Sequence, residues 1–442
     1  MARYLRLTGE VFCSIPIYYF TYIITSVMKK LLFLLLVFCM SSLLNSCDGN
    51  KSGGSASDGI KTISLPDAIG KERIVNLSEV AQSIRYIPLE ISDSSLLGNI
   101  PRPILENGVF YVTIRSGLKE EFMMYNIDGK FLGKLGRYGR AAGEYQTNMS
   151  SPALSVDYKS GNPIIFSTNK VIEYDKKGNF IKEVKSPVES TFNLILLRVK
   201  KLGDNYISTL YNFDQRKSFY LFFNANGEAI EEAPELHKAQ NRDGLITKES
   251  NEVSTTILSA SNAIAVSTPY MYDYKDNTRL MGNTDTLYTF NPKMEKRALY
   301  HFEYGKYELP LNSTGDQRSQ SIFLISGFTC EWEDHLFLTY NFGNNEPNGY
   351  TPPLVRGVFN KKSGELTLLK RVTPEIGGFK NDLDDGAPFW PVYISREGEM
   401  IMPLSVAKFI ELSEKYDSPE MKRVAATLTE ESNPVMVVVE QK

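Results

Sequence analysis

The sequence is poor in the residues on which thiol and metal chemistry depend, with four cysteines and three histidines among 442 residues. Three of the cysteines lie within the first 47 residues, so Cys330 is alone in the rest of the chain and no disulfide framework can form there. Cys330 lies in GFTCEWEDHLFL, where we expect a buried small hydrophobic side chain in a strand. His335, five residues on, would face the opposite side of the same strand, which disfavours a thiol enzyme.

An excess of positive charge is also missing. Lys and Arg total 49 against 52 Asp and Glu, and the net charge is −3. Residues 1–46 carry four basic side chains and one acidic side chain, so without them the net charge falls to −6 (−3 − 3). Binding to nucleic acid requires a basic face, so no nucleic-acid partner is expected.

Helical spacing is missing as well, except at 405–416 and 418–431 near the C-terminus.

Long apolar runs are confined to the N-terminus. Met28-Lys29-Lys30 is followed by LLFLLLVFCMSSLLNSC, which is an apolar run and then small residues before Cys47. This order predicts a secretory signal peptide over 28–46. Its end resembles the lipobox of bacterial lipoproteins, which implies that Cys47 is acylated with palmitate or related chains that anchor the protein in a membrane. An uncleaved N-terminal helix is the alternative.

The segments on either side of this signal are expected to lie outside the folded domain. Residues 1–27 hold a second apolar run, which a signal peptide does not need. We interpret them as an upstream extension before a true start at Met28, and a tandem membrane anchor is the alternative. Residues 47–60 are rich in Gly, Ser and Asp and predict a flexible tether.

Residues 61–442 alternate short runs of Tyr, Phe, Val and Ile with turns of Gly, Asn and Asp, which is the pattern of an antiparallel all-β protein. Five segments predict a hairpin, with an aromatic-rich strand, a turn of Asn or Asp with Gly, and a second strand. They are 122–136, 171–185, 220–233, 355–372 and, with Pro292 in place of the glycine, 287–302. Five further segments predict inner strands between these hairpins: ILENGVFYVTI, NPIIFST, LGDNYISTLYN, DHLFLTYNF and EGEMIMPLS.

The spacing of the hairpins indicates a propeller. The first three turns lie near Asp128, Lys177 and Asn226, about 49 residues apart. A repeat of this length with four short strands is typical of a propeller blade. The five hairpins and the region 387–442 therefore predict an all-β, six-bladed β-propeller over 61–442, with a short helical segment near the C-terminus. Two stacked β-sandwiches are the alternative.

Four segments resemble a known family. IRYIPLEISDSSLLGNI, GRYGRAAGEY, NDLDDGAPFWP and ESNPVMVVVEQK are similar, in this order, to segments of the six-bladed β-propeller lipoproteins of Gram-negative, Bacteroides-type gut bacteria, most of which have no assigned function. The resemblance implies an outer-membrane location and a terminal strand, VMVVVE, that closes the ring against ERIVNL near the N-terminus. One departure is Ala142-Gly143, where relatives have Gly-Pro.

The glycine-rich stretch LGRYGRAAGEYQ (135–146) is the first candidate site. It lacks the Gly-Lys-Ser/Thr ending of a phosphate loop and precedes no helix, so neither phosphate nor dinucleotide binding is expected. We interpret it as a loop between blades, whose glycines allow close packing and whose Glu144 pairs with Arg137 or Arg140. The alternative is a ligand-binding loop on a rigid scaffold, with these candidate residues: Arg137, Tyr138, Arg140, Glu144 and Tyr145.

NDLDDGAPFWP (381–391) is the second candidate site. Asp382, Asp384 and Asp385 beside Trp390 are suited to coordinating calcium or facing a sugar, although Leu383 interrupts the EF-hand spacing. The alternative is an Asx-rich turn whose aromatic residues pack between blades. No cofactor is evident elsewhere in the sequence, and calcium at this loop is the one candidate.

These features favour a non-catalytic module in the cell envelope, held to the membrane by its lipid, that binds a glycan or peptide through aromatic and charged loops. Two alternatives are open. One is a metal-dependent hydrolase or lyase with its site at the central channel, for which the sequence shows no clustered His/Asp motif. The other is a structural partner in an envelope protein complex.

Overall fold

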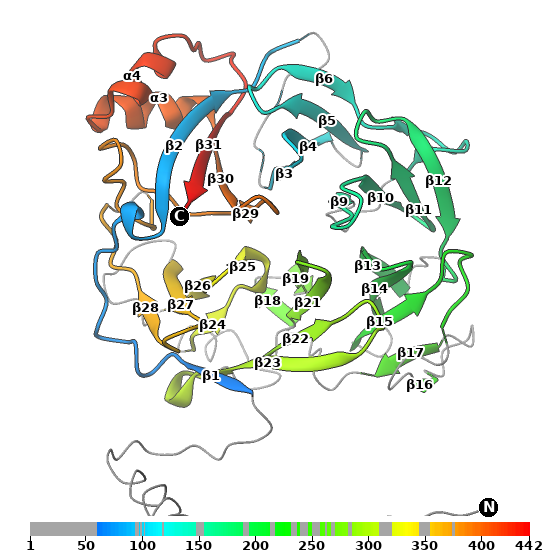
Figure 1. Cartoon of the computed structure of the whole chain (residues 1–442). Coiled ribbons are helices and arrows are strands. Elements are labelled where there is room, and N and C mark those ends of the chain that lie inside the picture. The colour runs from blue at the N-terminus through cyan, green and yellow to red at the C-terminus, as the bar shows by residue number, and fades with distance from the viewer. Residues whose placement is uncertain are drawn as a thin grey trace, which may run out of the picture. The chain divides into compact units, whose positions relative to one another are not determined.

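The computed structural model describes residues 60–442 except 93–96, 98–99, 101, 117–118, 147–153, 189–193, 213–216, 231–236, 239–245, 250–256, 261–262, 267–269, 282–284, 309–320, 344–353 and 374–375. Six antiparallel blades follow one another around a ring, which confirms the predicted six-bladed β-propeller (Figure 1). The predicted upstream extension (1–27), the signal peptide, Cys47 and the tether up to residue 59 lie outside the described residues.

The first three blades follow the chain without interruption. Blade 1 contains β3 (Ile104–Glu106), β4 (Val109–Ser116), β5 (Lys119–Asn126) and β6 (Phe131–Lys134). Blade 2 contains β9 (Leu154–Val156), β10 (Pro163–Ser167), β11 (Lys170–Tyr174) and β12 (Phe180–Lys185). Blade 3 contains β13 (Leu194–Leu202), β14 (Asn205–Asn212), β15 (Lys217–Phe223), β17 (Ile246–Glu249) and β16 (His237–Lys238).

The last three blades include strands from near the N-terminus. Blade 4 contains β20 (Tyr270–Tyr274), β21 (Asn277–Met281), β22 (Thr286–Phe290), β23 (Lys296–Glu303) and β1 (Lys61–Ser64). Blade 5 contains β25 (Cys330–Trp332), β24 (Phe323–Leu324), β26 (His335–Asn341), β27 (Leu354–Asn360) and β28 (Leu366–Leu368). Blade 6 contains β29 (Tyr393–Ile394), β30 (Glu399–Leu404), β31 (Val435–Gln441) and β2 (Ala81–Pro88).

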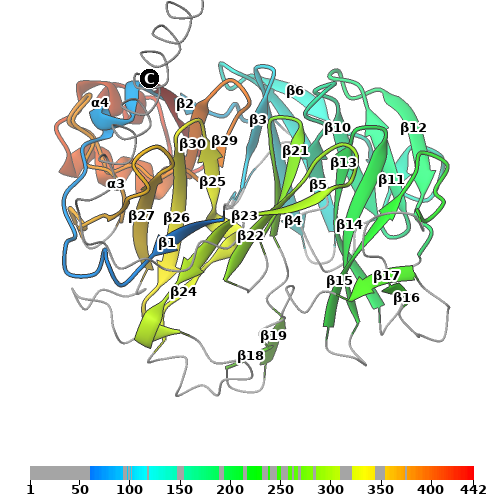
Figure 2. The ribbon, with the colours of Figure 1, turned by 60° about the horizontal axis from the view of Figure 1, so that its bottom comes forward.

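Smaller elements complete the fold. Among the described residues, two short strand pairs stand outside the blades: β7 (Arg137–Tyr138) with β8 (Glu144–Tyr145), and β18 (Ile257–Ala260) with β19 (Ala263–Val266). Figure 2 shows β18 and β19 below the ring. Within the described residues, the helical elements are η1 (Leu77–Glu79), η2 (Gly305–Tyr307), η3 (Ser326–Phe328), α3 (Val406–Lys415) and α4 (Pro419–Ala425). The two α-helices lie where the sequence predicts them, and the hydroxyls of Ser405 and Ser418 cap their first turns.

The turn after the third strand shares one construction in blades 1 to 4. In blade 1, the side-chain oxygen of Asn126 accepts hydrogen bonds from the backbone N–H groups of Asp128 (3.0 Å) and Lys130 (2.8 Å). Gly129 follows with a φ of 84°, a conformation that glycine adopts at little cost. In blade 4 a methionine, Met294, takes the corresponding conformation with a φ of 65°. The turn therefore depends on the Asn or Asp more than on the glycine.

Four of the five predicted hairpins are confirmed as β5–β6, β11–β12, β22–β23 and β27–β28. The hairpin predicted over 220–233 is wrong in its second half, because β15 ends at Phe223, only an isolated bridge to Ala229 follows, and β17 pairs with β15 instead. The predicted inner strands are the second strands of their blades. The innermost strands are β3, β9, β13, β20, β25 and β29, and four of them have two or three residues.

The region of Cys330 corrects a second expectation. Cys330 is buried in β25, as predicted, and burial raises the pKa of its thiol to about 12. His335 does not continue this strand, because it begins β26 and pairs with Trp332 across a tight turn. The chain reverses here because Glu333 takes a φ of 36°. No pattern in the sequence predicts this conformation at a glutamate.

The ring is closed by pairing the two ends of the described chain. β31 lies between β30 and β2, and its register with β2 runs from Ala81↔Gln441 to Pro88↔Val435. The prediction that the terminal strand pairs with an N-terminal segment is confirmed, but the partner is β2 and not ERIVNL (72–77). Those residues instead bridge to Leu369 and Lys380, which lie between the last strand of blade 5 and the first strand of blade 6.

The N-terminal segment 61–88 also crosses the outer edge of three blades. β1 pairs in parallel with β23 of blade 4, the bridges at Arg73 and Asn76 attach the next residues after blade 5, and β2 completes blade 6. Figure 1 shows this blue segment running along the outside of the ring. Because it covers strand edges of successive blades, it protects them from pairing with other chains.

Gly129 provides a stability test of the packing between blades. A Cβ atom at this position would lie 2.2 Å from the backbone oxygen of Pro88, whereas at Gly108, with a similar φ of 71°, it would meet nothing within 4 Å. We expect Gly108→Ala to lower the free energy of unfolding by about 1 kcal/mol through backbone strain. Gly129→Ala should cost about 2–4 kcal/mol, because overpacking adds roughly 1–3 kcal/mol. Urea unfolding measures both, and equal losses would contradict the contact.

Candidate functional site

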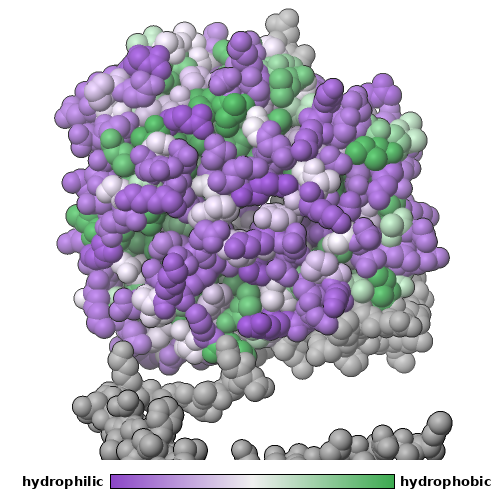
Figure 3. Space-filling view, viewed as in Figure 1, coloured by the Kyte–Doolittle hydropathy of each residue, from purple (hydrophilic) through white to green (hydrophobic). Residues whose placement is uncertain are grey.

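The ends of the innermost strands surround a cavity of about 180 Å³ to which all six blades contribute. We term it the channel mouth, and its lining residues are Ile104, Glu106, Val156, Tyr158, Lys200, Asp273, Tyr274, Lys275, Glu331, Trp332, Glu333, Tyr393, Ile394, Ser395 and Arg396. Figure 3 shows the face of the ring on which it opens, where mainly hydrophilic residues surround the middle. Because the innermost strands of all blades end here, the fold places distant residues side by side.

Ion pairs at and beside the channel mouth connect neighbouring blades. Four blade junctions are bridged in this way, by Arg396 Nε–Glu106 Oε2 (2.8 Å), Lys201 Nζ–Glu173 Oε1 (3.1 Å), Lys200 Nζ–Asp273 Oδ2 (2.8 Å) and Arg279 Nε–Glu331 Oε2 (2.8 Å). Since each blade contributes one partner, these contacts fix the angle between blades as well as the charges around the cavity.

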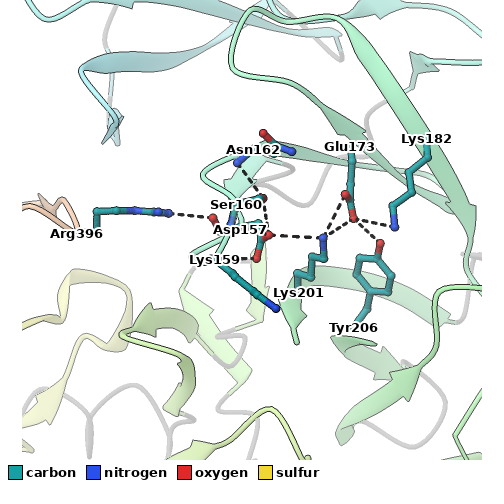
Figure 4. Close-up of polar contacts among 9 residues, drawn as sticks. All are labelled: Asp157, Lys159, Ser160, Asn162, Glu173, Lys182, Lys201, Tyr206 and Arg396. Atoms are coloured by element: carbon teal, nitrogen blue, oxygen red, sulfur yellow. Dashed lines mark hydrogen bonds and ion pairs between the residues drawn. The ribbon is translucent and has the colours of Figure 1, made fainter. Parts of the chain in front are cut away.

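The junction of blades 2 and 3 is shown in Figure 4. The Lys201 ammonium lies between two buried carboxylates, 3.5 Å from Asp157 Oδ2 and 3.1 Å from Glu173 Oε1. Tyr206 donates a hydrogen bond of 2.6 Å to the same Glu173 oxygen, and the Ser160 hydroxyl donates to Asp157 (2.5 Å). The charges here are satisfied within the protein, so this cluster supports the wall of the channel mouth.

Glu106 occupies the junction of blades 6 and 1. Its carboxylate accepts hydrogen bonds from the Tyr393 hydroxyl (2.6 Å) and from Arg396 Nε (2.8 Å). Burial raises the pKa of Glu106, although Tyr393 and Arg396 act in the opposite direction. The Arg396 guanidinium also stacks over Tyr158, with its Cζ 5.0 Å from the ring centroid, and donates to the carbonyl of Asp157 (2.9 Å).

Glu331 is the most enclosed carboxylate of the channel mouth, with a side chain that is 3% exposed. It accepts hydrogen bonds from Arg279, Lys361 (2.7 Å) and Tyr272 (3.2 Å). Burial alone would raise the pKa of Glu331, but the charges of Arg279 and Lys361 outweigh it, so the pKa lies below its usual value. The carboxylate is therefore ionised and holds two cations at the edge of the cavity.

Aromatic side chains line the channel mouth beside these charged groups. Tyr158, Tyr274, Trp332 and Tyr393 come from four different blades. Trp332 lies against the backbone of Gly398, where a Cβ atom would come within 2.6 Å of its ring. Together with four carboxylates (Glu106, Asp273, Glu331 and Glu333) and three cations (Lys200, Lys275 and Arg396), these rings give the cavity apolar faces beside hydrogen-bonding edges.

The first predicted loop lies between blades 1 and 2, away from this cavity. Glu144 accepts a hydrogen bond from the backbone N–H of Ala141 (3.0 Å) and pairs with Arg137, and these contacts lower the pKa of its carboxyl. Cβ atoms at Gly136 and Gly143 would come within 2.5 Å and 2.8 Å of aromatic side chains of blade 2. The predicted packing of the glycines and the pairing of Glu144 with Arg137 are confirmed.

The other candidates of this loop differ in exposure. Tyr138 and Arg140 are exposed, whereas Tyr145 is buried with its ring centroid 5.0 Å from that of Phe122. A role for Arg137, Tyr138, Arg140, Glu144 and Tyr145 in ligand binding stays a prediction.

The second predicted loop packs against blade 6. Asp382 accepts hydrogen bonds from the backbone N–H (2.9 Å) and hydroxyl (2.6 Å) of Ser78, which hold the pKa of its carboxyl below the usual value although burial raises it. Asp384 accepts from the hydroxyls of Tyr86 (2.9 Å) and Ser418 (2.6 Å). The carboxylates therefore connect this loop to the N-terminal segment and to α4.

The remaining residues of this loop divide between surface and core. Asp385 is exposed with a φ of 56°. Trp390 is buried and stacks on Phe379 with ring centroids 5.5 Å apart, as the interpretation of packing between blades predicts. Among the described residues, no group of three or more His, Cys, Asp or Glu is placed to hold a metal ion. Calcium and ligand binding by Asp382, Asp384, Asp385 and Trp390 stay predictions.

Sequence reasoning missed the channel mouth itself. Its ion pairs join residues far apart in the chain, and Glu106 and Arg396 are 290 positions apart. The signal that was available is positional, because Glu106, Tyr274, Trp332 and Arg396 each lie at or just after the end of an innermost strand. Assigning those strands correctly would have placed these residues around one opening.

Comparisons with known proteins agree with this architecture. The model of a family described as "Domain of unknown function (DUF4934)" matches residues 60–440. The chain belongs to the DUF4934 family. No match was found among curated proteins.

A crystal structure from Bacteroides fragilis NCTC 9343, described as a "Putative exported protein", is similar to this DUF4934 protein with a TM-score of 0.59 and 18% sequence identity, covering 87% of this chain and 99% of that one. BamB from Moraxella catarrhalis has a TM-score of 0.34 at 13% identity, with 73% of this chain and 75% of BamB covered. In the part of the DUF4934 chain that the structure describes, no helix is long and apolar enough to cross a membrane.

Proposed function

We propose that this DUF4934 protein is a lipid-anchored envelope protein that binds a glycan, without catalysis, by holding one sugar residue in the channel mouth. The observation that carries the proposal is the convergence of aromatic rings, carboxylates and cations from six blades on one cavity of about 180 Å³. Rigid concave sites with a few convergent polar groups are the usual place for small ligands.

The size of the cavity selects the kind of ligand. Pockets for drug-sized molecules measure roughly 300–1,000 Å³, and the channel mouth is smaller than this range at about 180 Å³. A cavity of this size suits a single sugar ring or the end of a glycan chain better than a peptide segment. The glycan is therefore favoured over the peptide that the sequence leaves as an equal option.

The chemistry of the lining supports a neutral, hydroxylated ligand. Tyr158, Tyr274, Trp332 and Tyr393 offer rings on which the C–H face of a sugar can stack. The carboxylates of Glu106 and Asp273 are paired with cations and keep further lone pairs to accept hydroxyl hydrogens. Since most of the charges neutralise one another, the lining provides hydrogen bonds without a strong preference for ionic ligands.

The proposed location rests on the N-terminus and on one structural relative. The basic start, apolar run and Cys47 favour export followed by acylation and anchoring in the outer membrane. The Bacteroides fragilis structure with the same fold is described as an exported protein, which supports export of this chain. Detection of palmitate on Cys47 and its loss in Cys47→Ala test the anchor.

Thermal unfolding with a panel of neutral mono- and disaccharides tests the binding proposal. A sugar at a hundred times its Kd should stabilise the protein by about 2.7 kcal/mol. Trp332→Ala and Tyr158→Ala each remove a ring from the channel mouth, and each is expected to weaken binding tenfold or more, or about 1.4 kcal/mol. Tyr138→Ala, which removes an exposed ring from the predicted loop at 135–146, should leave the Kd unchanged.

Comparing the variants at the channel mouth with Tyr138→Ala shows at which of the two sites the sugar binds. If Tyr138→Ala weakens binding and Trp332→Ala does not, the ligand binds at the loop and not at the channel mouth. Titration calorimetry at a temperature far below the Tm of every variant separates the loss of binding from a loss of stability.

A further inference from the structure

A second group of cations lies at the other end of the innermost strands, away from the channel mouth. Tyr270 begins β20, four residues before Tyr274, which at ~3.3 Å per residue puts the two about 13 Å apart along the strand. Arg102 likewise precedes Glu106 of β3 by four residues. Tyr270 and Arg102 are therefore separated from the site proposed for the sugar, and Arg198 precedes Lys200 of the channel mouth by two residues on β13.

Three guanidinium groups alternate with aromatic rings at this end. The Cζ atoms of Arg102 and Arg198 each lie 4.8 Å from the centroid of the Tyr270 ring. The Phe328 ring follows, with its centroid 5.3 Å from Arg102 Cζ and 6.0 Å from Arg356 Cζ. We term Arg102, Arg198 and Arg356 the arginine stack. Its members come from blades 1, 3 and 5 or from the residues that lead into them.

In the part of the chain that the structure describes, no carboxylate pairs with the arginine stack. Arg102 and Arg198 contact aromatic rings, and Arg356 donates a hydrogen bond of 2.5 Å to the Thr339 hydroxyl. The Nε atoms of Arg198 and Arg356 are buried without a hydrogen-bond partner. At the channel mouth, by contrast, the Arg279 guanidinium is held by a buried carboxylate.

The electrostatics of the arginine stack are those of an unneutralised site. Burial lowers the pKa of Arg198 to about 10, and the charge of Arg102 acts in the same direction. Burial also lowers the pKa of Arg356 to about 10, with a further lowering from Arg371. Arg198 and Arg356 both still carry a proton at neutral pH. Buried cations without a counter-ion are costly, and an anion among them would remove that cost.

The geometry of a stacked guanidinium specifies the ligand. Aromatic rings cover its faces, but its N–H donors lie in the plane of the group and point away from the rings. Two oxygens on one atom match this fork and accept a bidentate pair of hydrogen bonds. We propose that the arginine stack is a binding site for an oxyanion, that is, a sulfate, phosphate or carboxylate group. This proposal does not depend on sugar binding at the channel mouth.

Thermal unfolding of the full chain in sodium sulfate tests this proposal, with sodium chloride at equal ionic strength as the reference. Arg198→Met removes one member of the stack, and Arg137→Met is the matched control because Arg137 is exposed and paired with Glu144. We expect a saturable rise in Tm for the wild type and the control that Arg198→Met lacks. The general stabilisation by sulfate does not saturate and should be equal in all three proteins.

The Tm of Arg198→Met without sulfate serves as a control for the folding of this variant. Because it replaces an unpaired buried cation with an apolar side chain, its Tm without sulfate should equal or exceed that of the wild type. A lost sulfate response in a protein of undiminished Tm then reports the loss of the site. A wild-type response that does not saturate, or one that Arg198→Met reproduces, would overturn the proposal.

Glucuronate and glucose distinguish a free inorganic anion from an acidic sugar. A saturable response to glucuronate that exceeds the response to glucose, and that Arg198→Met loses, supports a carboxylate carried on a sugar. A response to sulfate with no such difference supports an inorganic anion. If Arg198→Met keeps the whole difference between glucuronate and glucose, the carboxylate is bound elsewhere and that form of the proposal is wrong.

Discussion

A chain that ends at Asn433 is expected to lack a cooperative thermal unfolding transition, because it has no β31. Five consecutive residues of this strand, from Val435 to Val439, are at most 1% exposed. Val435, Val437 and Val439 pack in the core that contains α3 and α4, whereas Met436 and Val438 pack against blade 1. The strand thus belongs to two cores and also carries the hydrogen bonds of β2 and β30.

The stabilisation that is lost with β31 is comparable to the stability of a whole domain. Burial of each such side chain contributes roughly 1.5–3 kcal/mol, so the five together contribute roughly 8–15 kcal/mol. A whole domain is stable by only about 5–15 kcal/mol. Differential scanning calorimetry should therefore show no cooperative peak for the truncated chain. A chain that ends at Glu440 keeps all five residues and should retain its peak, and a cooperative peak near the wild-type Tm in the shorter chain would contradict closure by β31.

Glu331→Gln is expected to lower the free energy of unfolding by about 3–5 kcal/mol, because removing one partner of a buried ion pair leaves the others uncompensated. The carboxylate holds Arg279 at 2.8 Å and Lys361 at 2.7 Å. The matched control is Glu333→Gln, two residues along, where the pair with Lys275 is 3.6 Å long and both side chains are more than half exposed. Exposed pairs contribute about 0–1 kcal/mol.

The pH dependence of stability is a second test of the ion pairs made by Glu331. The pKa of Glu331 is lower in the folded protein than its usual value, because Arg279 and Lys361 outweigh the effect of burial. Its contribution to stability is therefore present above the unfolded pKa of roughly 4.3 and is lost as the pH falls through the folded pKa. Between pH 6 and pH 3, wild-type stability should fall more steeply than that of Glu331→Gln. Parallel curves would show that folding does not lower the pKa of Glu331.

The parts of the fold that local sequence determines were predictable. The turns at Asn126, Asp175 and Asn291 use a side-chain oxygen to bind backbone N–H groups within four residues, so each turn is encoded where it occurs. The caps at Ser405 and Ser418 are local in the same sense. Blade number followed from counting such signals.

The parts that were missed depend on distant residues or on very short strands. β29 has two residues and β25 has three, which is too short for any alternation to be visible. The choice of β2 over 72–77 as the partner of β31 depends on where the chain can reach after crossing blades 4 and 5. Pairs such as Lys200 with Asp273 arise only when the ring closes.

A crystal structure of the protein with the tightest-binding neutral sugar of the panel tests sugar binding at the channel mouth most directly. We expect electron density for one sugar ring in the channel mouth, against Tyr158 or Trp332 and within hydrogen-bond distance of Glu106 or Asp273. Density at the loop 135–146 or at 381–391, with the channel mouth empty, would contradict the proposed function.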